Sequence, residues 1–331
     1  MVKIICPKCQ GELVQNTPFL IRCAECLAEY EMVNGIPVLL PDAAPKTSLE
    51  KIDYNKIHGI DEKTIKNIYS GWKDVFAEYL LPGAKVLEIG SGTGALTIGM
   101  AQSGDFKNVT ATDVSLKFLM GVKHQLQHLS NIEYVVCDGN NPPFASSQFD
   151  IVLGRSILHH LIDYKTTLAQ CKSILKDGGL AIFFEPVLQG KAIIALMIDL
   201  MVKMDQSFKL KVFTKEETKK LMHLVRHQTK SAWLPFSIER FSRMEDKYIF
   251  HVEEMKALGQ ELGFGSVEFV NNSKTPDASY KSYLHAHLKI IGISDQKVNA
   301  FQSIFDAFEE TWGAVFNNSL ATPMGYFIFK K

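Results

Sequence analysis

A glycine-rich turn that directly follows a hydrophobic strand carries the clearest chemistry in the chain. The strand is predicted at Val86–Ile89, the turn at Gly90–Gly94, and a helix from Ala95 onward. Glycines let the backbone turn sharply and approach a ligand closely. The unpaired N–H groups of the following helix offer hydrogen bonds to it. We therefore expect a nucleotide-like ligand at this turn.

Glu88 separates two classes of nucleotide ligand. The spacing Gly90-x-Gly92-x-x-Ala95 also fits a relaxed dinucleotide-binding pattern, and Asp113 lies 19 residues after Gly94, near where a ribose-binding acid is expected. A carboxylate beside the first glycine would repel a pyrophosphate. S-adenosylmethionine has no phosphate and carries an ammonium and a sulfonium, which a carboxylate attracts strongly in a partly dry site. Glu88 thus favours a cationic ligand, either directly or by ordering the turn.

Acidic residues also stand at the ends of the next predicted strands. Val109–Thr112 is predicted to be a strand that ends at Asp113, which is placed to accept both ribose hydroxyls. Ile132–Cys137 is predicted to be a strand that ends at Asp138, whose carboxylate could accept the adenine amino group. Further strands are expected at 149–154, 180–185, 266–270 and 324–329.

These residues, in this order and spacing, resemble the class I S-adenosylmethionine-dependent methyltransferases, most clearly over roughly residues 50–186. The matching positions are Glu88-x-Gly90-x-Gly92-x-Gly94, Asp113, Asp138, Phe149–Asp150 and Leu175–Gly179. The resemblance implies an α/β fold with a Rossmann-like seven-stranded sheet whose seventh strand is antiparallel. It also implies cofactor contacts from Glu88, Gly90, Ser91, Gly92, Gly94, Asp113, Val114, Asp138, Gly139 and Arg155.

Two Cys-x2-Cys pairs at the N-terminus predict a metal site. Cys6 and Cys9 are followed, after 13 residues, by Cys23 and Cys26. Four thiolates at this spacing form a closed tetrahedral zinc site, whereas the alternative of two disulfides is disfavoured in a cytosolic protein. The segment resembles small zinc-ribbon activators of methyltransferases and the zinc module of ribosomal-RNA guanine methyltransferases. Because it carries more acidic than basic residues, we expect a structural or docking role.

The predicted domain order follows from these motifs. Residues 1–42 form the zinc ribbon, 43–84 a linker and N-terminal helices, and 85–331 the methyltransferase domain. On the seven-stranded template, about 187–250 and about 272–322 are helical insertions. They follow the carboxyl ends of strands, where ligands bind in open α/β sheets, so we expect them to form a lid.

The catalytic candidates are His159 and His160, which follow the fourth predicted strand. Their ordinary pKa range suits a general base, but they could also pack or line the cofactor site. Tyr54, Tyr69 and Trp72 are expected either to close over the cofactor or to belong to the core. The motif Asn141–Phe144 resembles one used by methyltransferases of adenine or glutamine amides, but it precedes the fourth strand, so we interpret it as a proline turn.

Composition narrows the possible partners. The chain has 331 residues with 36 basic and 36 acidic side chains, and its longest apolar stretch is too short to span a bilayer. We therefore expect a cytoplasmic enzyme, which could form a homo-oligomer, that uses S-adenosylmethionine and a structural zinc. Its predicted methyl acceptor is an oxygen or nitrogen of a small molecule. The alternatives are an RNA methyltransferase whose ribbon binds RNA, which the neutral charge disfavours, and a non-catalytic cofactor-binding scaffold.

Overall fold

The computed structural model describes residues 2–40, 61–76, 83–230, 237, 239, 241, 243–271, 280–313 and 320–331. The chain divides into two compact units. Unit 1 comprises residues 1–183, 258–268 and 327–331, and unit 2 comprises residues 184–257 and 269–326. The expected linker and Tyr54 lie outside the described residues.

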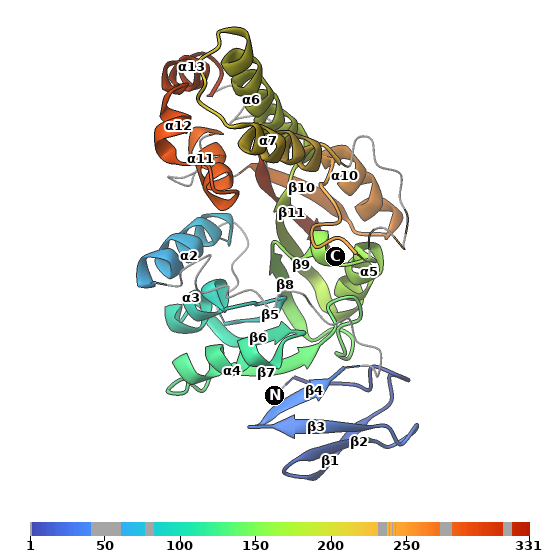
Figure 1. Ribbon diagram of the computed structural model, residues 1–331. Helices are drawn as coiled ribbons and strands as arrows, with labels where there is room; N and C mark the ends of the chain where they lie inside the picture. Colours follow the sequence, from blue (N-terminus) through green and yellow to red (C-terminus); the bar gives the residue numbers. More distant parts are fainter. Residues whose placement is uncertain are drawn as a thin grey trace. The chain divides into compact units, whose positions relative to one another are not determined.

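A seven-stranded sheet forms the framework of the fold (Figure 1). Its strand order is β7-β6-β5-β8-β9-β11-β10. The strands are β5 (Ala84–Ile89), β6 (Phe106–Asp113), β7 (Ile132–Cys137), β8 (Phe149–Arg155), β9 (Leu175–Pro186), β10 (Ser266–Asn271) and β11 (Met324–Lys330). β5 pairs in parallel with both β6 and β8, and β6 pairs in parallel with β7. The carboxyl ends of these four strands therefore share one edge of the sheet.

The direction of β11 follows from hydrogen bonds at its two ends. Lys331 N donates to Gly179 O near the start of β9, and Val187 N, just after β9, donates to Pro323 O. β11 therefore runs antiparallel to β9. The predicted fold class, with an antiparallel seventh strand between the fifth and the sixth, is confirmed.

Helices pack on the sheet and bury its apolar side chains. They are α2 (Glu62–Phe76), α3 (Ala95–Ser103), α4 (Leu116–Gln125), α5 (Tyr164–Ile174) and α10 (Val252–Glu261). α3 is buried over most of its length because α2 approaches it closely at Gly99. A Cβ at Gly99 would lie 2.6 Å from Cβ of Tyr69, and Trp72 is fully buried. Trp72 therefore packs in the core, whereas Tyr69 is half-buried against α3 and its Oη donates to Asp105 Oδ2.

The N-terminal cysteine segment extends the same sheet. Its strands β1 (Leu13–Thr17), β2 (Leu20–Cys23) and β3 (Glu29–Val33) pair antiparallel, and β3 pairs antiparallel with β4 (Ile36–Leu39). β4 then pairs in parallel with β7 through Val38 opposite Val136 and Leu39 opposite Cys137. The described strands thus form one continuous sheet from β1 to β10 (Figure 1). The sequence did not indicate this pairing.

Unit 2 has a helical core of its own. It contains α6 (Leu188–Ser207), α7 (Lys215–Gln228), α11 (Tyr280–Ile290), α12 (Asp295–Asn299) and α13 (Gln302–Phe308), followed by a π-helical turn at Glu309–Gly313. A capping box begins α7, where Thr214 and Glu217 exchange hydrogen bonds. Residues 298–308 are divided between α12 and α13.

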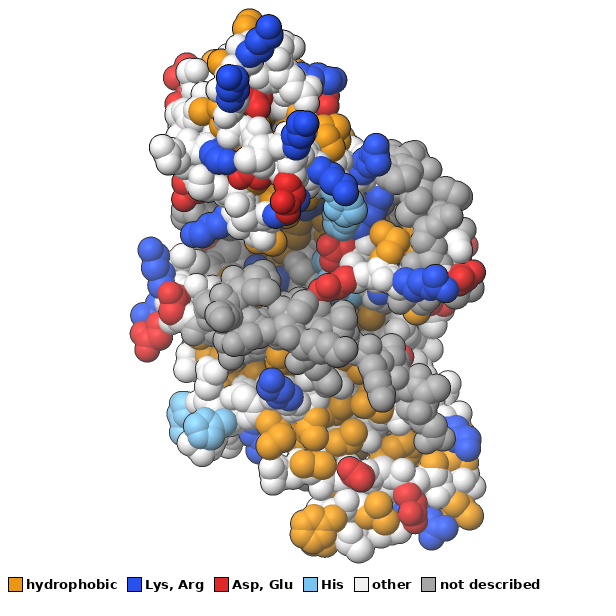
Figure 2. Space-filling view, viewed as in Figure 1, with side chains coloured by type: hydrophobic (Ala, Val, Ile, Leu, Met, Phe, Trp, Pro, Cys, Tyr) orange, Lys and Arg blue, Asp and Glu red, His pale blue; other side chains and the backbone are white. Residues whose placement is uncertain are grey.

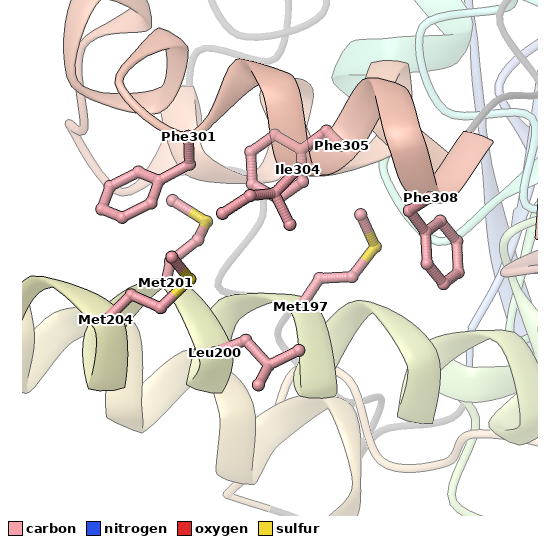
Figure 3. A pocket seen from close by; sticks show the side chains of 8 residues that line it. All are labelled: Met197, Leu200, Met201, Met204, Phe301, Ile304, Phe305 and Phe308. Carbon is pink, nitrogen blue, oxygen red and sulfur yellow. The ribbon is translucent and has the colours of Figure 1, made fainter. Parts of the chain in front are cut away.

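An apolar groove separates α6 from α13 in unit 2 (Figure 3). It has an empty volume of about 310 Å³, including open solvent. Its lining consists of Met197, Leu200, Met201, Met204, Phe301, Ile304, Phe305 and Phe308. The helix α6 is apolar over much of its length. Leu196 and Leu200 are 54% and 45% exposed, so one face of the helix is open to solvent in the described structure.

Candidate cofactor and metal sites

The turn after β5 is shaped to leave space beside the backbone. Gly90, Gly92 and Gly94 all have positive φ, a conformation that side chains disfavour. A Cβ at Gly94 would lie 2.4 Å from Val122 of α4, so α4 can approach the turn only because residue 94 is glycine. A Cβ at Gly92 would meet no atom of the described residues within 4 Å. The turn is therefore packed on one side and open at Gly92.

Ser91 supplies an unused polar group at this open turn. Its Oγ is buried and, among the described residues, has no hydrogen-bond partner. Native structures rarely leave such a hydroxyl unpaired, so a ligand or a water is expected to complete it. α3 also begins at Gly94 without a side-chain cap. Both observations fit a small polar ligand lying against the turn.

Asp113 connects the ends of β5 and β6. Its Oδ2 accepts from Gly92 N at 2.8 Å, and its Oδ1 accepts from Ser115 N at 2.8 Å. Each carboxylate oxygen can accept a further hydrogen bond. Asp113 is therefore fixed at the sheet edge in the position expected for a ribose ligand, with Val114 half-buried beside it.

Glu88 is buried at the end of β5 and is 2% exposed. Its carboxylate accepts a hydrogen bond from Thr97 Oγ1 on α3, and its backbone oxygen accepts one from Thr112 Oγ1 at 2.8 Å. Burial raises the pKa of Glu88 to about 7, against the lowering effects of Thr97 and of the Arg155 charge. Of the two roles expected for Glu88, these contacts support the ordering of the turn. Sequence reasoning missed Thr97, which no motif marks.

The burial of Glu88 predicts a specific pH dependence of stability. Its pKa is about 4.5 in the unfolded chain and about 7 in the folded one, so the folded protein prefers the neutral acid. Its contribution to stability is fully present below about pH 4.5 and is lost as the pH rises through 7. In Glu88→Gln, the free energy of unfolding should no longer fall by up to about 3 kcal/mol as the pH rises from 4.5 to 7. Denaturant unfolding at several pH values measures this. The exposed Glu216→Gln is the control; parallel pH profiles for both variants would contradict the assignment.

The remaining predicted cofactor residues lie at the ends of β7 and β8. Asp138 Oδ1 accepts from Asn140 N at 2.9 Å and from Asn140 Nδ2 at 2.7 Å, which fixes the loop after β7. Gly139 O accepts from Thr167 Oγ1 at 3.1 Å. Arg155 is exposed at the end of β8, and its charge acts on Glu88. Because β5 to β8 are parallel, all the predicted cofactor residues gather at one edge of unit 1.

The two candidate bases lie in a short 3-10 turn, Leu158–His160, after β8. The ring centres of His159 and His160 are 4.1 Å apart, and His159 is the more buried of the two. His160 N donates to Ile157 O at 2.9 Å, so the turn is ordered by its own backbone. The structure therefore places both imidazoles beyond the carboxyl end of β8, as the sequence predicted.

The four N-terminal cysteines converge. Their Sγ atoms lie within 4.8 Å of one another, with Cys6 and Cys26 3.7 Å apart and Cys9 and Cys23 3.5 Å apart. A tetrahedral zinc with Zn–S bonds of about 2.3 Å would place its sulfurs roughly 3.8 Å apart. The donor set therefore fits a structural zinc site.

The proline turn has a second role that the sequence did not reveal. Ile5 N donates to Pro143 O at 2.9 Å, and Ala145 N donates to Lys3 O at 3.0 Å. Ile4 also forms an isolated antiparallel bridge with Phe144. The turn at Asn141–Phe144 therefore holds the start of the cysteine segment, separately from the pairing of β4 with β7.

Comparison with known proteins agrees with this geometry. Residues 87–183 match the family model described as a methyltransferase domain. A demethylmenaquinone methyltransferase of Corynebacterium urealyticum is 35% identical over 116 residues, which cover 34% of this chain and 47% of that protein. A polyketide synthase-like protein of Preussia isomera is 32% identical over 115 residues, covering 31% of this chain and 5% of that protein.

The chain is also similar to a solved structure, at low sequence identity. Phosphoethanolamine N-methyltransferase 2 of Haemonchus contortus, in complex with S-adenosyl-L-methionine, is 15% identical, with a TM-score of 0.48, over 84% of this chain and 56% of that one. The chain matches less than half the length of the curated relatives described above. No helix among the described residues is long and apolar enough to cross a membrane.

The fold and the turn define the class: this is an S-adenosylmethionine-dependent methyltransferase fold. Within that class, residues 87–183 match the methyltransferase domain model named above, and the match includes the whole Glu88–Gly94 turn.

Proposed function

We propose that the protein transfers a methyl group from S-adenosylmethionine to an oxygen or nitrogen of a small molecule. One observation carries the proposal: the family match begins at the strand that holds Glu88 and the open glycine turn. Glu88, Gly90, Ser91, Gly92 and Gly94 would hold the cofactor at the turn. Asp113 with Val114 would hold its ribose, Asp138 with Gly139 its adenine, and Arg155 would lie beside Glu88.

The residues of this chain would act mainly by positioning. Bound S-adenosylmethionine supplies an activated methyl group on its sulfonium. Holding the acceptor atom in line with that methyl group can account for much of the rate enhancement. An oxygen or nitrogen acceptor that carries a proton must also lose it, and we assign this role to His159 or His160, which lie beyond β8 at the same sheet edge.

We also propose that Cys6, Cys9, Cys23 and Cys26 hold a structural zinc. The distances between their sulfurs support this, because they match those of a closed four-thiolate site. The site leaves no open position for chemistry. Its role would be to fold the segment that contributes β4 to the sheet.

Two observations favour a small-molecule acceptor over RNA. The cysteine segment uses β4 and its first residues to bind the rest of unit 1, and its charge is acidic. The similar protein of C. urealyticum is named for a small-molecule acceptor, demethylmenaquinone. The RNA methyltransferase and the non-catalytic scaffold are the alternatives. The cytoplasmic location and a homo-oligomeric state stay predictions.

Methyl transfer from labelled S-adenosylmethionine tests the proposal. The full chain is incubated with small-molecule extract or with ribosomal RNA, and the labelled product is isolated. We expect label in a small molecule and none in RNA. Label in RNA, with binding that falls steeply as salt rises, would replace the small-molecule proposal. A protein that binds the cofactor and labels neither fraction would favour the scaffold.

Single substitutions then separate a base from a bystander. For an acceptor that loses a proton, we expect either His159→Ala or His160→Ala to lower kcat by about 100-fold or more, and the other to change it little. The measurement is kcat and KM at several pH values, since loss of a base removes the acidic limb of the kcat profile. Equal, small effects of both substitutions would assign the imidazoles to packing.

A further inference from the structure

Unit 2 contains lysines that are unusually buried. Lys191 on the first turn of α6 is 6% exposed, and Lys230, just after α7, is 3% exposed. Moving an ammonium group out of water is costly unless a negative charge or several good acceptors compensate it. Lysines are therefore seldom this buried without a partner of opposite charge.

The direct contacts of both ammonium groups are with neutral groups. Lys191 Nζ donates to Tyr283 Oη and lies 4.4 Å from the centre of that ring. Lys230 Nζ donates to the backbone oxygen of Asp246 and lies 3.2 Å from His227 Nε2. Within the described part of the chain, no carboxylate oxygen lies within ion-pair distance of either Nζ.

The groups around these lysines form one cluster in unit 2. Lys191 and Lys230 repel each other electrostatically, and Asp246 attracts both. His227 Nε2 lies 3.5 Å from Asp246 Oδ2, and the His287 ring stacks on Tyr283 with centres 4.2 Å apart. Asp246 is the carboxylate that faces the cluster in the described residues, and its side chain is 41% exposed. The cluster can thus carry more positive than negative charge.

The pKa values of these groups are consistent with an anion-binding site. Burial lowers the pKa of Lys191 to about 7 and that of Lys230 to about 8, although Asp246 opposes both shifts. Burial also lowers the pKa of His227 to about 4. An anion among these groups would favour their protonated forms, and Tyr283 Oη and the imidazoles could then donate to it.

We propose that Lys191, Lys230 and Tyr283 form a binding site for the anionic oxygens of a small molecule that carries a phosphate or a carboxylate. A purely structural pair of lysines would be expected to face buried carboxylates rather than a hydroxyl and a backbone carbonyl. This last assignment rests on the proposed function: if the protein transfers a methyl group as proposed, the anionic group belongs to the methyl acceptor.

Inorganic phosphate and succinate are the probes, added separately to the full chain during thermal unfolding. We expect at least one of them to raise the melting temperature of the natural protein, because it binds only the folded state. Lys191→Met and Lys230→Met should each weaken that probe at least about tenfold. Without any probe, both variants should melt at or above the natural temperature, since each removes a buried uncompensated charge.

A matched control tests whether the exposed lysines of unit 2, and not the buried pair, bind the anion. Basic side chains gather over α6 and α7 in Figure 2, and these could bind anions weakly. Lys203→Met, on the exposed face of α6 where Lys203 pairs with Asp199 at 2.5 Å, should leave the effect of the probe unchanged. Phosphorus NMR of inorganic phosphate, and proton NMR of succinate, measure binding without reliance on any variant's stability.

Three outcomes would overturn the inference. They are absence of binding of both probes to the natural protein by NMR, an equal loss in Lys203→Met, and a fall in melting temperature of Lys191→Met and Lys230→Met with probe affinity retained. The proposed methyltransferase function has a separate readout in S-adenosylhomocysteine binding. A natural protein that binds phosphate or succinate but does not bind S-adenosylhomocysteine would reject the methyltransferase function and keep the anion site.

Discussion

Asp113→Ala is expected to weaken S-adenosylhomocysteine binding by about 100-fold, measured by titration calorimetry. The carboxylate lies at the end of β6 and already accepts hydrogen bonds from Gly92 N and Ser115 N. Removing it would free the open turn at Gly92 and would also remove the proposed acceptor of the ribose hydroxyls. Hydrogen bonds to a charged group contribute roughly 1.5–3 kcal/mol each, so losing two would produce an effect of this size.

Two further variants test how the expected loss of S-adenosylhomocysteine affinity arises. Asp113→Asn keeps one acceptor oxygen and should bind with intermediate affinity. Asp177→Ala is the matched control and should bind normally, because the Asp177 side chain is fully exposed and lies 3.7 Å from Lys331 Nζ. Unchanged affinity in Asp113→Ala would remove Asp113 from the cofactor site, and with it the assignment of the neighbouring Val114.

The turn could be predicted because its signal is local. A hydrophobic run, a carboxylate, three glycines and a helix follow one another within a few residues, and together they indicate a strand, a tight turn and a helix. The parallel order of β5 to β8 then brings Asp113, Asp138 and Arg155 to the same edge without any further information. The antiparallel last strand, in contrast, was implied by the family resemblance and not by a local signal.

Long-range pairings could not be predicted in this way. No residue of β4 predicts its pairing with β7, because Ile36–Leu39 is a short apolar strand without a distinguishing motif. The turn at Asn141–Phe144 was interpreted correctly as a proline turn, but its contact with Ile5 depends on where a distant segment lies. Lys191 and Lys230 belong to no motif and meet only because helices of unit 2 pack together. Specificity in this protein is expected to depend on such contacts.

Removing the proposed zinc from the cysteine cluster is expected to unfold residues 2–40 and to destabilise the cofactor-binding sheet as well. β4 pairs with β7, which ends one residue before Asp138. Ile36 and Leu39 are fully buried, and Ile36 packs with Ile98, Leu119 and Val136 of the sheet and its helices. Exposing these two side chains alone costs roughly 3–6 kcal/mol. That is a large fraction of a typical folding free energy, and we expect a fall in melting temperature of about 10 °C.

Hydrogen exchange distinguishes this coupling from unfolding of the ribbon alone. After chelation, amides of β7 should exchange faster, because one edge of that strand loses its partner, whereas amides of β9 should change little. Metal analysis of the untreated protein should find about one zinc per chain. A Cys6→Ser, Cys9→Ser double variant is the control: it should resemble the chelated protein and respond no further to chelator.

The outcome also decides what the cysteine segment contributes to the proposed methyltransferase. Unfolding confined to residues 2–40, with β7 protected and cofactor affinity unchanged, would make the segment an independent module that could serve in binding a partner. Metal-free protein with the cysteines oxidised would remove the zinc assignment itself. Loss of β7 protection together with weaker S-adenosylhomocysteine binding would show that the metal supports the cofactor site through β4. The register of Val38 with Val136, and of Leu39 with Cys137, favours this last result, because it places the paired end of β4 next to Asp138.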